Sequence, residues 1–172
     1  MQEMKTIYLM RHSKSDWESD FKIDHERPLS ERGKKNAKEL RKFLVDRKIK
    51  FDISYISDST RTVQTYEILK KEVNFSEVKI SSKLYETNFT TLYDLIKQTD
   101  DKLNSILLLG HNPEVEEFAN HLILRQNSNL EKSFFQKFPT SAFLSLTLNI
   151  THWELISTTA AKILYFWIPT KS

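Results

Sequence analysis

Residues 105–110, with the sequence SILLLG, form a continuous apolar run of the length of one strand. An apolar run without alternation is typical of a central parallel strand that is buried on both faces of its sheet. The polar residues His111 and Asn112 follow it, and Pro113 favours the start of a helix with Asn112 as its N-cap. A buried strand that leads into a helix is the repeating unit of α/β folds.

Further strands and helices alternate on both sides of this unit. Runs rich in β-branched and aromatic residues predict strands over residues 5–10, 52–57, 77–81, 142–148 and 162–168, with THWEL at 151–155 as a further candidate. Apolar residues three and four apart predict helices over residues 31–47, 60–73 and 89–98, and from residue 112 onward. The order predicts an α/β protein, a three-layer α/β/α sandwich around a mostly parallel mixed sheet.

Two of these helices carry more detailed expectations. Ser30 is expected to cap the helix over residues 31–47, because a serine side chain can accept hydrogen bonds from the first free backbone N–H groups. The helix over residues 60–73 is expected to bury one apolar face. The residues of that face are Val63, Tyr66, Leu69 and Val73.

Composition narrows the class of protein. A length of 172 residues predicts a single domain over residues 1–172, and 39% hydrophobic with 28% charged residues is a globular composition. The absence of cysteine excludes a disulfide framework, a zinc–thiolate site and a cysteine nucleophile. A net charge of +3, with lysines spread along the chain, gives no indication of nucleic-acid binding. Only Gly33 and Gly110 are glycines, and each is expected to mark a position where a side chain does not fit.

Hydropathy gives no indication of a membrane protein. No apolar run approaches the roughly 20 residues of a transmembrane helix. The apolar stretch before Arg11 is too short for the central region of a signal peptide. We therefore expect a cytoplasmic protein with no membrane partner.

Charged and imidazole side chains follow four of the predicted strands. They are Arg11 with His12, Arg61, Glu86 and His111. In an open α/β sheet the ligand binds at the carboxyl ends of the strands, so these side chains are expected to lie close together. Guanidinium groups match the oxygens of a phosphoryl group, and nearby positive charge keeps an imidazole neutral and nucleophilic at pH 7. The pattern predicts a phosphoryl-binding site.

The sequence also resembles a known family, the histidine phosphatase superfamily with the phosphoglycerate-mutase-like fold. Arg11-His12-Ser13 resembles its Arg-His-Gly signature, with Ser13 in the place of the glycine. The chain is most similar to the short branch, the SixA-type protein phosphohistidine phosphatases. The segments that carry the resemblance are residues 10–17, 27–33, 57–61 with 64–65, 84–86, 109–113 and 138–142.

The resemblance implies a role for each candidate residue. His12 would be the nucleophile that becomes phosphohistidine, and Arg11 and Arg61 would bind the phosphoryl oxygens. His111 would donate a hydrogen bond to a phosphoryl oxygen and stabilise the transition state. Glu86 stands where the larger branch of the family carries its general acid. If Glu86 is not the acid, the candidates are the first-loop carboxylates Asp16, Asp20 and Asp24.

No cofactor and no metal are expected, because two arginines already supply positive charge. A metal site built from His12, His111 and Asp24 is the alternative, and the same arginines would repel its cation. Only residues 87–110 lie between Glu86 and His111, which leaves no room for the helical cap of the sugar-phosphate members of the family.

An uncapped site favours a phosphorylated protein as substrate, most simply one that carries phosphohistidine. Water would then hydrolyse the phosphoenzyme. The alternatives are a small phosphomonoester substrate, a mutase of sugar phosphates, and a binding module that holds phosphate without turnover.

Overall fold

The computed structural model describes residues 4–124 and 137–170, which form one α/β unit around a six-stranded mixed sheet. The strands are β1 (Lys5–Arg11), β2 (Lys50–Ser57), β3 (Asn74–Ser81), β4 (Ser105–Gly110), β5 (Phe143–Leu148) and β6 (Lys162–Trp167). Their order across the sheet is β3-β2-β4-β1-β5-β6, and the first four are mutually parallel whereas β5 pairs antiparallel with both neighbours. The predicted fold class is confirmed, with β4 and β1 at its centre.

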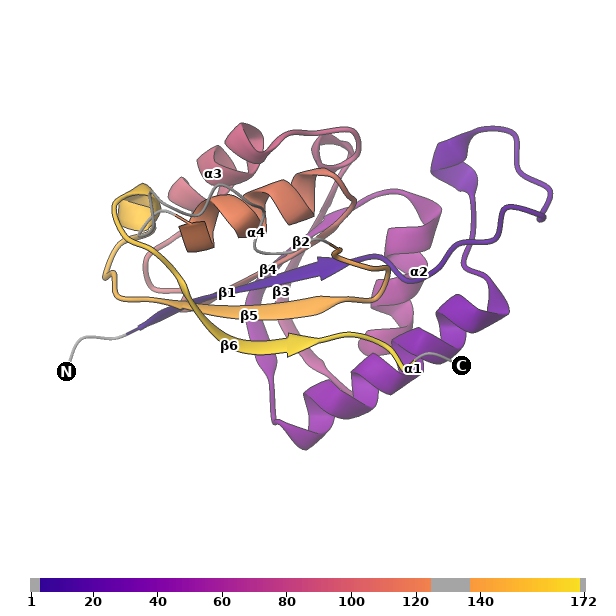
Figure 1. The fold of residues 1–172 in the computed structure, drawn as a ribbon, viewed down its shortest axis with the longest axis horizontal. Coiled ribbons are helices and arrows are strands. Elements are labelled where there is room, and N and C mark those ends of the chain that lie inside the picture. Colours follow the sequence, from indigo (N-terminus) through magenta and orange to yellow (C-terminus); the bar gives the residue numbers. More distant parts are fainter. Residues whose placement is uncertain (1–3, 125–136, 171–172) are drawn as a thin grey trace.

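Within the described residues, four helices cover the two faces of the sheet (Figure 1). They are α1 (Glu31–Asp46) and α2 (Thr60–Leu69) on one face, and α3 (Phe89–Lys97) and α4 (Glu114–Leu124) on the other. The connections of this part of the chain also hold short 3-10 helices, η1 (Asp24–Glu26), η2 (Ser82–Leu84) and η3 (Trp153–Ser157). None of the described helices is both long and apolar enough to span a lipid bilayer.

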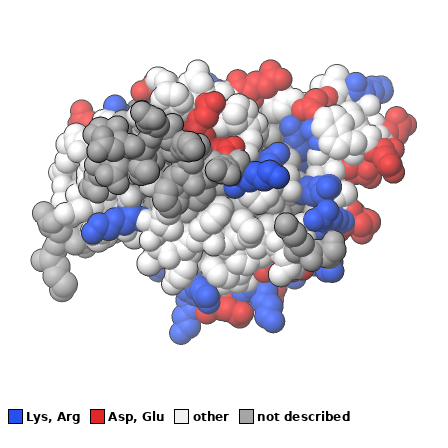
Figure 2. Space-filling model, viewed as in Figure 1, with Lys and Arg blue, Asp and Glu red and all other residues white. Residues whose placement is uncertain are grey.

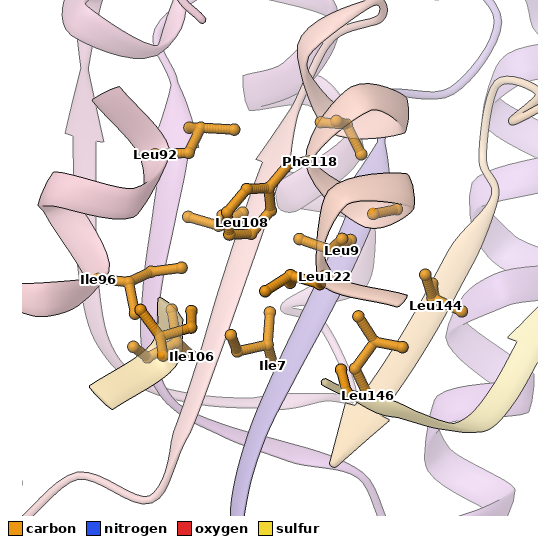
Figure 3. Packing of buried hydrophobic residues seen from close by; sticks show 14 of the residues in the cluster. Ile7, Leu9, Leu92, Ile96, Ile106, Leu108, Phe118, Leu122, Leu144 and Leu146 are labelled. Atoms are coloured by element: carbon orange, nitrogen blue, oxygen red, sulfur yellow. The ribbon is translucent and has the colours of Figure 1, made fainter. Parts of the chain in front are cut away.

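The sheet separates two apolar clusters because successive side chains of a strand point to opposite faces. From β1, Ile7 and Leu9 pack with Phe118 and Leu122 of α4, as Figure 3 shows, whereas Met10 packs on the side of α1 and α2. Both faces of β1 and β4 are therefore buried. The carboxyl ends of these strands are held at fixed positions on the same edge of the sheet.

Three predictions about helices and strands are wrong. Residues 151–155 form no strand: the backbone N–H of Trp153 donates to Asp101 Oδ1 (2.7 Å) and its indole N–H to the carbonyl of Leu103 (2.9 Å), which fixes the 3-10 helix η3 instead. The fourth helix begins at Glu114, and Asn112 is not its N-cap: the side chain of Asn112 donates to the carbonyl of Phe138 (2.9 Å).

The third error concerns α2, which ends at Leu69 and buries polar residues. Its buried positions are Arg61, Thr62, Thr65 and Leu69. Of the expected apolar face, Leu69 and Val73 are in the core and Tyr66 packs against it, whereas Val63 is half-buried. Both threonine hydroxyls donate to backbone carbonyls at or near the start of the same helix. Thr62 Oγ1 donates to the carbonyl of Ser59 (2.9 Å), and Thr65 Oγ1 donates to the carbonyl of Arg61 (2.7 Å). Helix α2 therefore presents the hydroxyl of Thr65 to the loop after β1 and the apolar side chains of Tyr66 and Leu69 to the core.

The capping prediction for α1 is confirmed, since Ser30 Oγ accepts from the N–H of Gly33 (3.0 Å). The same serine donates from its N–H to the carbonyl of Lys14 (2.9 Å), so the first loop packs tightly on the start of the helix. A Cβ atom at Gly33 would overlap this carbonyl, whereas one at Gly110 would meet only Val115 Cγ2, at 3.6 Å. Gly33 is thus a position without room for a side chain, and Gly110 is not.

This difference predicts opposite outcomes for two alanine substitutions. Gly33→Ala is expected to lower the free energy of unfolding by about 2 kcal/mol, because the Lys14 backbone must move to make room. Gly110→Ala is the matched control and should change it by less than about 1 kcal/mol. Urea unfolding followed by circular dichroism measures both. Equal effects would show that the contact between Gly33 and Lys14 does not restrict this position.

Candidate active site

Three of the predicted site residues come into direct contact at the carboxyl edge of the sheet. His12 follows β1, Arg61 lies in the first turn of α2, and His111 follows β4. Arg61 Nε is 3.4 Å from His12 Nε2, and Arg61 Nη2 is 3.4 Å from His111 Nδ1. The two imidazole rings have centroids 5.2 Å apart. All three residues are at most 7% exposed, so one guanidinium faces two buried imidazoles.

The hydrogen bonds of His12 define which of its nitrogens carries the hydrogen. Nδ1 lies 2.6 Å from the carbonyl oxygen of Ser13, which can only accept, so Nδ1 carries the hydrogen. Nε2 then has an unprotonated lone pair and faces Arg61. Burial lowers the pKa of His12 well below its usual range, and the positive charges of Arg61 and Arg11 act in the same direction. At neutral pH His12 is therefore an uncharged imidazole whose Nε2 carries no hydrogen and accepts a long hydrogen bond from Arg61 Nε (3.4 Å).

His111 is neutral for the same reasons. Burial and the charge of Arg61 lower its pKa from 6.5 to about 4. Its Nε2 is 2.8 Å from Ser57 Oγ and 3.4 Å from Ser59 Oγ. A serine hydroxyl both donates and accepts, so Ser57 is compatible with a hydrogen on either nitrogen of the His111 ring.

A carboxylate in the first loop holds the outer edge of Arg61. Arg61 Nη1 donates to the carbonyl of Asp24 (2.9 Å), and Nη2 donates to Asp24 Oδ2 (3.0 Å). Asp24 also accepts from Arg27 Nη2 (2.8 Å) and from Tyr85 Oη (2.8 Å). Partial burial opposes its ionisation, but the hydrogen bonds from Arg27 and Tyr85 and the charge of Arg61 keep the pKa of Asp24 well below its usual range.

An ionised Asp24 is a poor candidate for a general acid, and it joins three segments of the chain instead. Sequence reasoning named Asp24 only as a reserve acid or metal ligand, and it assigned no role to Tyr85. Among residues 4–124 and 137–170, no three His, Asp or Glu side chains are placed to hold a metal ion together. Asp24 pairs with both Arg61 and Arg27, and its side chain is 46% exposed.

Arg11 lies at the other side of the pocket. Its Nη1 donates to the carbonyl of Phe138 (3.1 Å), and its buried Nε has no partner among the described residues. Its positive charge helps to lower the pKa of both His12 and His111. An open hollow of about 400 Å³ begins at Arg11; its other lining residues are Asn112, Glu116, Lys137, Phe138, Pro139 and Thr140.

Ser13, which stands in the place of the signature glycine, directly follows His12 and is fully buried. Its hydroxyl lies 2.6 Å from the hydroxyl of Ser141, and its N–H donates to Thr65 Oγ1 (3.0 Å). The side chain is thus accommodated by a hydrogen bond with the segment before β5. Ser13 leaves the contacts of His12 Nε2 with Arg61 in place.

Glu86 makes no contact with the group formed by His12, Arg61 and His111. It is exposed, it has a left-handed backbone with φ of 51°, and it makes no hydrogen bond through its side chain within the described residues. It acts on its surroundings through charge, because it raises the pKa of Tyr85 and of Glu114. Glu86 therefore lies at the rim of the pocket.

Sequence reasoning missed Glu114, a second carboxyl group close to His111. Glu114 is 8% exposed, and its Oε2 is buried with no partner among the described residues. Burial raises its pKa, and the charges of Glu117 and Glu86 raise it further. It lines a cavity of about 10 Å³ with His111, room for about one water molecule. The only feature of the sequence that could have indicated Glu114 is its position directly after His111-Asn112-Pro113.

Comparison with known proteins places this site in a family. The family model for the histidine phosphatase superfamily (branch 1) matches residues 7–140. The chain is 28% identical over 162 residues to an uncharacterized protein of Mycobacterium tuberculosis, which covers 93% of this chain and 99% of that protein. It is 29% identical over 166 residues to the 2,3-bisphosphoglycerate-dependent phosphoglycerate mutase of Buchnera aphidicola, with 87% of this chain and 71% of the mutase covered.

Solved structures agree in fold. A protein from Nakamurella multipartitia that is assigned as a phosphohistidine phosphatase SixA superposes with a TM-score of 0.82 at 19% identity, over 98% of both chains. A second protein so assigned, from Agrobacterium tumefaciens, gives 0.79 at 24% identity, over 96% of this chain and 98% of that chain. The protein histidine phosphatase SixA in complex with tungstate gives 0.75 at 21% identity, over 94% and 95%. With its family model matched over residues 7–140, this chain belongs to the histidine phosphatase superfamily, branch 1.

Proposed function

We propose that the protein is a metal-independent phosphatase that removes a phosphoryl group from phosphohistidine on another protein. The observation that carries this proposal is the unprotonated Nε2 of neutral His12, which faces Arg61 beside His111. Membership of a phosphatase superfamily supports the reaction class, and the similarity in fold to SixA structures supports the substrate class.

The proposed reaction has two steps. His12 Nε2 attacks the phosphorus atom, a bond from phosphorus to Nε2 forms, and the bond to the leaving group breaks. The departing nitrogen or oxygen takes a proton from water or from an acid. Water then attacks the phosphohistidine, the bond to Nε2 breaks, and inorganic phosphate leaves with His12 neutral again.

The surrounding side chains stabilise the charge on the transferred group. Arg61 directs Nε and Nη2 toward the two imidazoles, and the unpartnered Nε of Arg11 supplies a further donor. His111 can donate from Nδ1 to a phosphoryl oxygen when three changes occur together: the ring proton moves from Nε2 to Nδ1, Ser57 donates to Nε2, and the oxygen takes the place of Arg61 Nη2 in front of Nδ1. These fixed donors supply the positive charge that a divalent cation supplies in other phosphatases.

The open shape of the pocket supports a protein substrate. No cap covers the carboxyl edge of the sheet within residues 4–124 and 137–170, and the hollow at Arg11 is open to solvent. A small sugar phosphate would remain largely exposed in such a site, whereas a side chain on a protein surface can enter it.

Turnover of a phosphohistidine protein in the presence of a chelator tests this proposal. Incubation with a histidine-phosphorylated phosphotransfer protein in excess EDTA should release phosphate at the rate seen without EDTA, since no cation takes part. A matched phosphoserine protein should be hydrolysed much more slowly, because its alkoxide leaving group needs protonation. Binding without phosphate release would indicate a non-catalytic module, and dependence on added Mg²⁺, Mn²⁺ or Zn²⁺ would contradict metal independence.

Substrates with different leaving groups test whether Glu86 is the general acid. If Glu86 protonates the leaving group, Glu86→Gln should slow hydrolysis of alkyl phosphates by on the order of 10²-fold and leave phosphohistidine and p-nitrophenyl phosphate nearly unchanged. Steady-state rates on the three substrates decide this. The comparison variant is Glu114→Gln, since Glu114 is a buried carboxyl group that lines a cavity together with His111. Equal losses on all three substrates with Glu86→Gln would refute its role as acid.

A further inference from the structure

The loop between β1 and α1 exposes apolar side chains beside the pocket. Trp17 is 69% exposed and Ile23 is 58% exposed, which is unusual for side chains of this size. The rings of Trp17 and Phe21 meet edge to face with centroids 6.3 Å apart. We call Trp17, Phe21, Ile23 and the charged residues from Asp16 to Glu26 the first-loop surface.

This surface is held in place from beneath. The guanidinium of buried Arg27 lies 3.5 Å from the centre of the Trp17 ring. Arg27 itself donates to Asp24 and to Ser15 Oγ. At the base of the loop, the N–H of Asp16 donates to the carbonyl of Pro28 (2.8 Å). These contacts hold the exposed Trp17 ring in one position. The side chain therefore loses less conformational entropy when a partner binds to it.

Direct contacts connect the first-loop surface to the phosphoryl pocket. Trp17 stacks on Arg27, Arg27 binds Asp24, and Asp24 binds Arg61, the residue that faces His12. On the same side, His25 lies against the ring of Tyr85, with centroids 4.9 Å apart, and Tyr85 lies 5.5 Å from the ring of His111. The first-loop surface is therefore linked, through Arg27 and Asp24, to the residue that faces His12.

The first-loop surface is acidic although the pocket is basic. Asp16, Glu18, Asp20 and Glu26 form no ion pair with any described residue, and only Lys14 and Lys22 offset them between residues 13 and 26. Acidic side chains gather at the right-hand end of the molecule in Figure 2, where Figure 1 shows this loop. A free phosphorylated metabolite carries two negative charges and is repelled by such a rim. A protein surface with basic residues around its phosphoryl group is attracted to it.

We propose that the first-loop surface is the docking site for the protein substrate, and that it selects phosphorylated residues whose neighbours are basic and apolar. The proposal rests on the proposed phosphatase function and extends it to the choice of substrate. Trp17 supplies the apolar anchor, and Glu18 and Asp20 supply the charge selection. Aromatic anchors of this kind, fixed before binding and surrounded by polar residues, carry much of the binding energy in protein interfaces.

Two synthetic phosphohistidine peptides that differ only in their flanking residues test the charge selection. One carries Lys and Leu around the phosphohistidine and the other carries Glu and Leu. The wild type should hydrolyse the basic peptide with kcat/KM on the order of 10-fold higher, and about 0.5 M NaCl should reduce the difference because it screens surface charge. Each rate is normalised to p-nitrophenyl phosphate, which reports the pocket alone.

Variants assign the selection to this loop. Glu18→Lys/Asp20→Lys should abolish or invert the preference, while the matched control Glu77→Lys/Glu154→Lys makes the same change of charge on exposed residues elsewhere and should keep it. Trp17→Ala should raise KM for the basic peptide on the order of 10-fold with a smaller effect on kcat, and Trp17→Phe should restore most of the affinity.

Three results would overturn the proposal. The first is an equal kcat/KM for the two peptides in the wild type. The second is an unchanged ratio in Glu18→Lys/Asp20→Lys. The third is a wild type that is a dimer in solution and becomes a monomer in Trp17→Ala with an unchanged ratio of kcat/KM for the two peptides. This result would assign the surface to contact between two copies of the chain. In each case p-nitrophenyl phosphate turnover still shows whether the phosphatase function stands.

Discussion

His12→Ala is expected to lower kcat by at least about 10³-fold on every phosphoryl substrate, because the attacking atom is removed. Nε2 of His12 is an unprotonated imidazole nitrogen inside the pocket, since the carbonyl of Ser13 fixes the proton on the opposite nitrogen. Neither Arg61 nor His111 can replace it, since guanidinium is not nucleophilic and His111 Nε2 is engaged with Ser57. Steady-state kinetics on p-nitrophenyl phosphate gives the measurement.

The matched control is His152→Ala. His152 is exposed at the opposite end of the molecule and pairs with Asp101, so its loss should leave kcat unchanged. A thermal melt establishes that His12→Ala is folded. If this variant is folded and keeps more than about one hundredth of the activity, a covalent intermediate on His12 is wrong, and direct attack by water takes its place.

Arg61→Gln is expected to lower kcat/KM by about 10²- to 10³-fold, the range found when a donor to the transition state is removed. The variant loses the charge next to His12, a donor to the transferred group and the anchor of Asp24 at once. Arg61→Lys should remain strongly impaired, because an ammonium group keeps the charge but cannot contact His12, His111 and Asp24 in the geometry of the planar fork.

Arg41→Gln is the matched control for this arginine. Arg41 donates to the carbonyl of Ile68 (3.1 Å) and pairs with Glu72 on the side of α1, away from the pocket. Its removal should leave kcat/KM unchanged. If Arg61→Lys is as active as the wild type, the positive charge alone supports catalysis. That result would refute a requirement for the planar guanidinium group.

The sequence predicted the part of this site that depends on strand order. Arg11, His12 and His111 lie at or directly after the ends of β1 and β4, and parallel strands bring the residues at their carboxyl ends to one edge of the sheet. The local sequence carries enough information for this step, because a buried strand and the residue after it belong to one short segment. The same holds for the serine cap of α1, which depends on residues three positions apart.

The contacts of Asp24 could not be predicted in this way. Its partners Arg61 and Tyr85 lie 37 and 61 positions away in the chain, and the first loop has no periodicity that fixes where its side chains point. Buried polar groups were missed for a related reason. Thr65 in α2 and Glu114 in α4 occupy positions that an apolar pattern does not mark, because hydrogen bonds and a cavity rather than hydrophobicity determine their burial.

The hydrogen bond between His12 Nδ1 and the carbonyl of Ser13 also decides the chemical identity of the proposed intermediate. Nδ1 is blocked by its own backbone, so the phosphoryl group can be attached only through Nε2. Of the two regioisomers of phosphohistidine, the enzyme would therefore form the one phosphorylated on the nitrogen farther from the backbone. The bond to Ser13 would persist throughout the cycle, and the ring would keep one orientation while it gains and loses its phosphoryl group.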